Sequence, residues 1–269
     1  MPEGHVVHAQ ARRLSRAFKG TAVDVDSPQG RFAAGARTVD GRVLTGTQAF
    51  GKHLFIEFAG EHSIHVHLGL YGKWAIAKGP APAVRGEIRL RLVNDTHHAE
   101  LRGPAVCELL DSAGMQERIA RVGPDPIRRD ADPERAWAKV QRSRQPIGAV
   151  LMDQTAFAGV GNIYRAEVLF RHRMSPYRVA NAVDRRAFDA MWADLAVLMA
   201  DGVRRRRIDT VRDIHLPEAM GRAPRVDRHG GEVYVYRRSG QPCWVCGDQV
   251  AADVMQGRNL YWCPTCQSA

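Results

Sequence analysis

The chain has 269 residues and a mass of 29.9 kDa, a length that allows one large domain or two ordinary ones. Hydrophobic residues make up 45% and charged residues 25%, a composition that excludes a chain disordered throughout. The 39 Lys and Arg residues against 29 Asp and Glu residues give a formal net charge of +10, which favours a polyanionic partner.

Neither a membrane span nor a signal peptide is expected. Charge or glycine interrupts every apolar run well before the roughly 18 residues that a span requires. The first five residues lack the basic and then apolar order of a signal peptide. The sequence therefore predicts a cytoplasmic protein with no membrane partner.

Arginine supplies nearly all of the positive charge, because lysine occurs only at positions 19, 52, 73, 78 and 139. A guanidinium can donate two hydrogen bonds to a phosphate and can stack on a base, whereas an ammonium is a point charge. This preference points to nucleic acid as the partner. An arginine-rich composition of the whole genome is the alternative.

The first half of the chain is expected to be rich in strands, with one helix at its start. Apolar residues at helical spacing predict an amphipathic helix over residues 5–18 that ends before Gly20. From about residue 21 to 110, short alternating segments punctuated by glycine, proline and aspartate predict strands, clearest over residues 42–44, 54–58, 63–68 and 88–92. We therefore expect a β-sandwich or barrel with a helix packed on it.

The second half begins after a turn-rich boundary at residues 123–126 and is expected to be mainly helical. Its helical periodicity covers residues 133–140, 146–152, 162–172 and 184–204. The last forty residues are again strand-like and contain four of the five cysteines.

Two Cys-x2-Cys pairs near the carboxyl end indicate a metal site. The first pair is Cys243 and Cys246, the second is Cys263 and Cys266, and sixteen residues separate them. This spacing is typical of a four-thiolate zinc site. Disulfides are disfavoured in a reducing cytosol, and a thioredoxin-type redox pair needs only one such motif. Since no open coordination position is evident, we expect one structural Zn²⁺.

Two further segments of this half are candidates for phosphate contacts. Residues 255–262, between the cysteine pairs, predict a hairpin with Arg258 at its tip. A Gly-x-Gly turn at residues 159–161 leads into a helix with Asn162 at the N-cap, where free backbone amides can bind an anion. A solvated arginine and an ordinary capped helix are the alternatives.

Two histidine pairs, His5 with His8 and His65 with His67, share a helix face and a strand face. We do not expect either pair to bind metal, because the cysteines already complete a site and strand-face histidines more often bond backbone or line a polar groove.

Four motifs occur along the chain in a fixed order: Pro-Glu-Gly at residues 2–4, Gly-Lys-His-Leu at residues 51–54, the turn motif of residues 153–167, and the four-cysteine finger with Gly-Arg at residues 257–258. Their order is the same as in the formamidopyrimidine-DNA glycosylase and endonuclease VIII family of bacterial base-excision repair enzymes. The sequence resembles this family over essentially its whole length, and endonuclease VIII more than the purine-directed members. The resemblance implies an α+β multidomain fold: an N-terminal catalytic β-sandwich with an N-terminal helix (1–122), a helix-two-turn-helix DNA-binding domain (123–229) and a zinc-finger β-hairpin (230–269).

The resemblance also implies a bifunctional DNA glycosylase and AP lyase. Removal of Met1, expected because the next residue is small, would give Pro2 a free secondary amine that attacks the deoxyribose C1′. The resulting Schiff base would permit β,δ-elimination at the abasic site. Glu3 would serve as general acid and base, and Lys52 as phosphate clamp or proton donor. An ordinary first-turn acid and an ordinary hairpin charge are the alternatives for these two side chains.

By the same resemblance, Asn162 and Arg258 would grip the phosphates that flank the lesion, and Arg258 would thereby assist catalysis. Leu70 and Tyr71 resemble the wedge with which endonuclease VIII fills the gap left by a flipped base. Strand-end core packing is their alternative. Arg102 stands where the purine-directed members begin an Arg-Phe-Gly loop, but Phe is absent here.

Oxidised pyrimidines and abasic sites are therefore favoured over 8-oxoguanine and formamidopyrimidines. The expected partner is damaged DNA, duplex or single-stranded, and the expected enzyme is a monomer associated with the bacterial nucleoid. A purine-directed glycosylase and a non-catalytic zinc-containing DNA-binding protein are the remaining alternatives.

Overall fold

The computed structural model describes residues 2–226 and 231–268, which form two compact units, Met1–Arg121 and Val122–Ala269. The expected boundary between residues 229 and 230 lies within residues 227–230, which are outside the described residues. Among the described residues, no helix is both long and apolar enough to cross a lipid bilayer.

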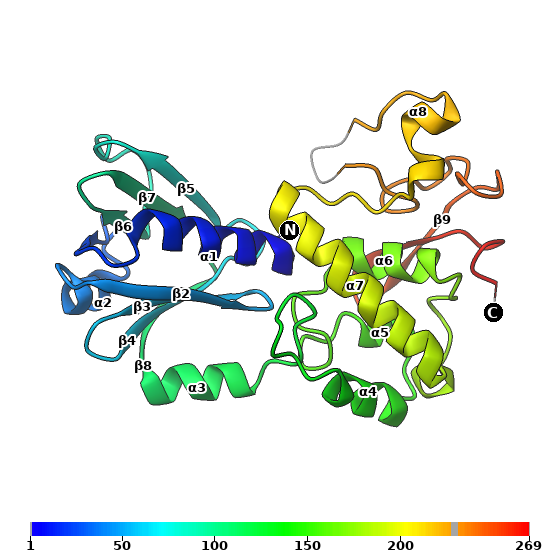
Figure 1. The fold of residues 1–269 in the computed structure, drawn as a ribbon, viewed down its shortest axis with the longest axis horizontal. Helices are drawn as coiled ribbons and strands as arrows, with labels where there is room; N and C mark the ends of the chain where they lie inside the picture. Colours follow the sequence, from blue (N-terminus) through cyan, green and yellow to red (C-terminus); the bar gives the residue numbers. More distant parts are fainter. Residues whose placement is uncertain (1, 227–230, 269) are drawn as a thin grey trace. The chain divides into compact units, whose positions relative to one another are not determined.

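The first unit contains two four-stranded antiparallel sheets (Figure 1). One sheet has the order β1-β6-β7-β5, formed by Asp24–Asp26, Leu90–Val93, His97–Arg102 and Lys73–Lys78. The other has the order β2-β3-β4-β8, formed by Leu44–Phe50, His53–Phe58, His62–His67 and Val106–Asp111. The expected β-sandwich is therefore confirmed.

Helix α1 (Gly4–Phe18) packs on strands of both sheets, and its apolar stripe completes the core of this unit. Val7, Leu14 and Phe18 are at most 1% exposed, as the helical spacing predicts. The inward residues of the strands alternate in the same way, since Leu54 and Ile56 in β3 are buried in this core. The N-terminal helix is thus confirmed, and it ends at Phe18 as expected.

Some elements of this unit differ from the expectation. Residues 42–44 were expected as a strand, but β2 begins at Leu44 and continues to Phe50, because the polar Thr47 and Gln48 conceal its alternation. The short helices α2 (Ala33–Val39) and α3 (Ser112–Ala120) were not expected. Each buries only one or two residues, so neither carries a long apolar stripe.

The second unit is mainly helical. Its α-helices are α4 (Pro133–Arg142), α5 (Ile147–Val150), α6 (Asn162–Arg171), α7 (Arg185–Arg205) and α8 (Pro217–Met220). Two 3-10 turns, η1 (Ala180–Ala182) and η2 (Asp213–His215), lie between them. The carboxylates of Asp132 and Asp184 cap α4 and α7 by accepting backbone hydrogen bonds. Of the described part of the last forty residues, β9 (Ala251–Met255) and β10 (Arg258–Trp262) form the strands.

A buried carboxylate on α6 organises the segment that leads into the zinc finger. Glu167 is fully buried and accepts backbone hydrogen bonds from Tyr234 (2.7 Å), Val235 (2.9 Å) and Tyr236 (2.9 Å). The Thr210 hydroxyl also donates to it. An unpaired carboxylate is costly to bury, so Glu167 needs these donors. Its hydrogen bonds in turn hold the backbone of residues 234–236 in place.

We expect Glu167→Gln to lower the free energy of unfolding by about 2–4 kcal/mol, because the amide that replaces one oxygen cannot accept from a backbone N–H. Urea denaturation followed by circular dichroism measures the change. The control Glu218→Gln, at an exposed position, should stay within about 0.5 kcal/mol of the parent protein. Equal effects of the two substitutions would contradict this role.

Candidate active site and metal centre

The start of the chain lies beside the turn between β2 and β3. Helix α1 and β2 run antiparallel, because the Gly20 amide donates to the Leu44 carbonyl (2.8 Å) and the Thr47 hydroxyl donates to the Ala11 carbonyl (2.6 Å). From the first pair to the second, the chain goes back nine residues, from Gly20 to Ala11, and forward three residues in β2, from Leu44 to Thr47. The same step from Ala11 brings the amino end of α1 toward the end of β2 at Phe50. Figure 1 shows the amino terminus at this end of α1.

Lys52 occupies that turn. The register pairs Phe50 with His53, so Gly51 and Lys52 form a two-residue turn, and Gly51 has the positive φ of 58° that favours glycine there. Lys52 is half-buried. The structure thus brings the turn lysine to the end of the sandwich that also holds the amino terminus.

Glu3 is the N-cap residue of α1 and is only 2% exposed. Its backbone carbonyl accepts from the Val6 amide at 2.9 Å, while its side chain does not cap the helix. An ordinary first-turn acid would lie in solvent, so burial favours the chemical role. Pro2 is half-buried directly before it, and Met1 lies outside the described residues.

The loop between β4 and β5 lies at the same end of the unit, because β4 ends at His67, which pairs with His53. Leu70 and Tyr71 at its tip are 60% and 83% exposed, which contradicts strand-end core packing. A Cβ on Gly69 would lie 2.7 Å from the Cβ of Ala105, and one on Gly72 would lie 2.3 Å from a backbone oxygen. Both glycines are therefore required for this tight, outward-facing loop.

Arg102 ends β7, and its guanidinium has partners within the unit. It donates to the buried carboxylate of Glu100 (2.6 Å) and to the backbone carbonyl of Arg85 (2.6 Å). The structure therefore gives Arg102 a role in holding the 85–102 segment. Its contact with DNA stays a prediction.

A chain of hydrogen bonds on the β3-β4-β8 sheet was not found from the sequence. Arg118 on α3 donates to Glu108 (2.8 Å), Glu108 contacts His65 Nδ1 (2.8 Å), and His65 Nε2 contacts His53 Nδ1 (2.9 Å). The rings of His53 and His65 stack with centroids 5.1 Å apart. The alternation of residues in the sequence indicates which side chains share a face of one strand. Only the register between the strands shows which of these side chains are neighbours.

The four cysteines converge in the second unit. The Sγ atoms of Cys243, Cys246, Cys263 and Cys266 all lie within 4.8 Å of one another, with close pairs at 3.4 and 3.9 Å. Sulfurs about 2.3 Å from a tetrahedral zinc lie about 3.8 Å apart, so this set fits Zn²⁺. The amides of Val245 and Cys266 also point at thiol sulfurs, at 3.4 and 3.5 Å. The site holds one structural zinc ion, as the spacing predicted.

The zinc-finger hairpin is tied to the start of α6. Gln256 and Gly257 both have positive φ, at 50° and 71°, and form a two-residue turn that leaves Arg258 exposed at the first position of β10. Arg165 is 1% exposed and donates to the Asn259 carbonyl at 2.9 Å and to the Asn162 side chain. This arginine therefore holds Asn162 and the Arg258 hairpin as neighbours.

The expected position of Asn162 is corrected by one residue. Gly161 is the N-cap of α6, with φ −128° and ψ −164°, and Asn162 is the first helical residue. No side chain caps this helix, and the Asn162 side-chain oxygen accepts from Arg165 instead. Arg165 itself was not singled out from the sequence. Its only signal was a charged residue three positions after Asn162, on the first turn of the helix.

A groove of about 550 Å³ borders the hairpin turn. Its lining includes Lys139 and Arg142 of α4 together with Gln256 of the turn, whose amide donates to Gln145 at 2.9 Å. The second unit thus presents basic side chains beside the hairpin that carries Arg258.

Family models match three parts of the chain. The formamidopyrimidine-DNA glycosylase N-terminal domain matches residues 1–104, the H2TH domain of the same glycosylase matches residues 122–213, and a zinc finger found in FPG and IleRS matches residues 240–269. The fold and the metal centre accordingly define a DNA-binding protein that combines a β-sandwich, a helix-two-turn-helix domain and a four-cysteine zinc finger.

The relatives extend this match over the whole chain. A Mycobacterium tuberculosis protein named Endonuclease 8 1 is 48% identical over 275 residues, covering 100% of both chains. A Mycolicibacterium smegmatis protein named DNA-(apurinic or apyrimidinic site) lyase Nei2 is 33% identical, again covering 100% of both. The chain belongs to the formamidopyrimidine-DNA glycosylase and endonuclease VIII family, as the motifs implied.

A solved structure confirms the fold. The complex of Lactococcus lactis Fpg with DNA containing an abasic site matches with a TM-score of 0.80 and 21% identity, covering 99% of this chain and 100% of that one.

We expect acid to destabilise the first unit partly through His53. Burial, with the nearby charges of His65 and His67, lowers the pKa of His53 from 6.5 to about 3. The unfolded state therefore binds more protons between these values, and the free energy of unfolding falls as pH drops below about 6.5, by up to about 1.4 kcal/mol per pH unit. In urea titrations from pH 7 to 4, His53→Asn should show a shallower decline than the parent. Parallel curves would exclude His53 as the source.

Proposed function

We propose that this protein is a bifunctional DNA glycosylase and AP lyase that uses Pro2 as its nucleophile. The observation that carries the proposal is the position of Pro2 at the amino end of α1, directly before the buried Glu3 and beside the Lys52 turn. The names of its relatives, an endonuclease 8 and an AP lyase, support the same activity.

The setting of Pro2 suits a nucleophilic amine. A terminal amine has a reference pKa of about 7.7–8.0, and the positive end of the 15-residue helix α1 opposes its protonation. Once Met1 is removed, the nitrogen of Pro2 attacks C1′ of the damaged nucleotide. The bond between C1′ and the base breaks, and the base leaves with the bonding electron pair and a proton.

The lone pair of the Pro2 nitrogen then expels O4′: the C1′–O4′ bond breaks, O4′ takes up a proton, and the opened sugar carries a covalent iminium. This iminium acidifies the C2′ hydrogens. We assign to Glu3 the role of accepting the C2′ proton, because Glu3 directly follows Pro2 in the chain and is only 2% exposed. Loss of this proton expels the 3′ phosphate, and a second elimination expels the 5′ phosphate. Lys52 clamps the phosphate or protonates a leaving group from the adjacent turn.

The second unit supplies the grip on the DNA backbone. Asn162 and Arg258 contact the phosphates that flank the lesion, and the Arg165 bridge keeps them as neighbours. The zinc ion holds the hairpin that carries Arg258. Lys139 and Arg142 extend this basic surface along the groove of α4.

Leu70 and Tyr71 fill the gap left by the flipped base. Their exposure of 60% and 83% on a glycine-hinged loop suits a wedge, since stacked bases can be replaced only by protruding side chains. We propose oxidised pyrimidines and abasic sites as the preferred substrates over 8-oxoguanine. The absence of Phe after Arg102 and the endonuclease 8 names of the relatives support this preference.

All groups assigned a role belong to one chain, so we propose a monomer that acts on damaged DNA, duplex or single-stranded, at the bacterial nucleoid.

We expect Pro2→Gly to abolish, or reduce by about a hundredfold or more, borohydride trapping of the protein on an abasic-site duplex. A primary amine lacks the ring that fixes the nitrogen of Pro2. Strand scission on a denaturing gel should fall in parallel, and Glu3→Gln should also prevent it. The control Lys78→Gln, at an exposed position at the end of β5, should trap normally.

Binding without any scission by the parent protein would support a non-catalytic DNA-binding protein instead. Undiminished trapping of Pro2→Gly through a lysine would overturn the assignment of the nucleophile.

We expect Leu70→Ala to reduce base excision by about tenfold or more while changing the affinity for undamaged duplex little, because the wedge acts only when a base is flipped. Single-turnover excision from a panel of duplexes that carry one oxidised pyrimidine, 8-oxoguanine or abasic site measures this, with the lesion preference of the parent protein read from the same panel. Equal losses in excision and in undamaged-duplex binding would argue against a wedge, and faster excision of 8-oxoguanine would reverse the proposed preference.

A further inference from the structure

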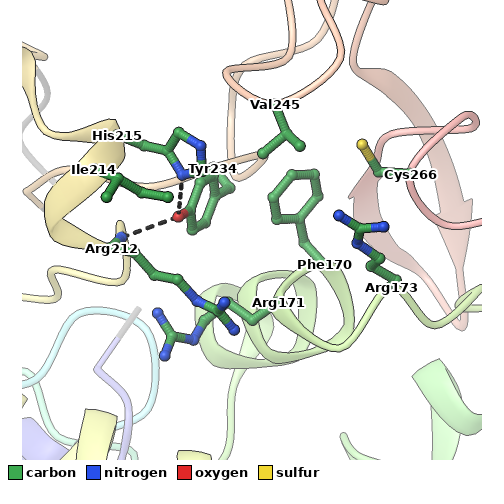
Figure 2. A pocket seen from close by; sticks show the side chains of 9 residues that line it. All are labelled: Phe170, Arg171, Arg173, Arg212, Ile214, His215, Tyr234, Val245 and Cys266. Atoms are coloured by element: carbon green, nitrogen blue, oxygen red, sulfur yellow. Dashed lines mark hydrogen bonds between the residues drawn. The ribbon is translucent and has the colours of Figure 1, made fainter. Parts of the chain in front are cut away.

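A second pocket lies at the carboxyl end of α6, within the second unit. It has a volume of about 260 Å³ and is lined by nine residues from α6, η2, the 234–236 segment and the zinc-binding loops (Figure 2). None of the nine is aspartate or glutamate, and Cys266 among them is one of the four zinc-binding cysteines. Since α6 has ten residues, its carboxyl end lies about 14 Å along the helix from Asn162. The pocket is therefore separate from the phosphate-binding end of the same helix.

Two guanidinium groups of the lining are available to a ligand. Arg173 and Arg212 are exposed, and neither side chain has a hydrogen-bond or ion-pair partner among residues 2–226 and 231–268. Arg171 differs, because it is held by the Asp194 carboxylate at 2.6 and 2.8 Å and by the Thr210 carbonyl at 2.6 Å. Two unpaired cations in a pocket without acids favour an anionic ligand.

The rest of the lining is apolar. Ile214 is 71% exposed and Val245 is 40% exposed, and both line the pocket. Figure 2 shows Val245 beside the Phe170 ring and Ile214 on the opposite side of Tyr234. An exposed isoleucine and valine beside a pocket are typical of a protein contact, since nucleic-acid backbones present polar groups to their partners.

The aromatic rings of the pocket are not placed for base stacking. Phe170 and Tyr234 stack on each other with centroids 4.6 Å apart, and they are 4% and 2% exposed. The Tyr234 hydroxyl also accepts from the Arg212 amide and contacts His215 Nδ1, each at 2.9 Å. A nucleobase would need a free ring face, whereas an aliphatic or aromatic side chain needs only apolar walls. The volume, below the roughly 300 Å³ of small-molecule sites, suits one such side chain.

We propose that this pocket binds a partner protein through a short acidic segment that carries one large apolar side chain. The side chain enters between Phe170, Ile214 and Val245, and carboxylates on either side pair with Arg173 and Arg212. Because the site lies at the other end of α6 from Asn162, the segment can be held without occupying the phosphate-binding end. The inference does not depend on the catalytic proposal.

Fluorescence anisotropy with zinc-loaded full-length protein tests the proposal. The probe is a labelled pentapeptide with phenylalanine at its centre and aspartate at the other four positions. We expect the double variant Arg173→Ala, Arg212→Ala to bind it at least about tenfold more weakly, because two charge-assisted hydrogen bonds are lost. A peptide with serine at the centre should also bind at least about tenfold more weakly, because a buried phenylalanine side chain contributes more than this factor.

The matched control is Arg129→Ala, Arg186→Ala, which removes the same charge from exposed positions of the same unit that do not line the pocket. It should bind the probe as the parent protein does. Equal losses in the two double variants would mean general charge attraction and would overturn the proposal, as would equal binding of the two peptides or no binding of either. Displacement of the probe by deoxyadenosine monophosphate that is lost only in the pocket variant would assign the site to a nucleotide and would likewise overturn it.

Discussion

The antiparallel packing of α1 on β2 is the constraint on which the catalytic end of the protein depends. Bonds at Gly20 and Thr47 fix the helix against the strand at two points, and the buried stripe of α1 prevents it from sliding. A shift by one helical turn would move Pro2 by about 5.4 Å, more than reactive geometry tolerates. The packing of the sandwich core therefore fixes the position of the amino terminus relative to the β2–β3 turn, which carries Lys52.

Helix α6 has a comparable part in the second unit. Within six positions it carries Asn162, for which we propose a phosphate contact, Arg165, which donates to the zinc-finger hairpin, and Glu167, which accepts from the 234–236 segment. Both charged side chains are buried, and each is compensated by several hydrogen bonds. The zinc ion contributes folding free energy to the finger, because the finger has only a few buried apolar side chains of its own.

The sequence predicted those parts of the molecule whose signal is local. Spacing alone identified the four zinc ligands, apolar periodicity identified α1 and the long helix α7, and motif order identified the family. The sequence was inaccurate in two places. The start and end of β2 were missed because its polar Thr47 and Gln48 interrupt the apolar alternation, and Asn162 was placed at the N-cap position that Gly161 occupies. The Arg165 bridge spans 94 positions, and the chain from Arg118 to His53 requires three strands in register. Contacts of this kind follow from the fold and leave no pattern in a single sequence.

The loop that carries Leu70 and Tyr71 has a consequence for how lesion choice can change over time. Its two glycines leave no room for any side chain, and Ala105 closes one side of it, so the backbone cannot drift without disturbing the sandwich behind it. The two outward positions are 60% and 83% exposed, so they can be exchanged with little change in the stability of the protein. The substrate range of this enzyme can therefore change by point substitutions at residues 70 and 71. The glycines that shape the loop, and the stability of the protein, would be unaffected.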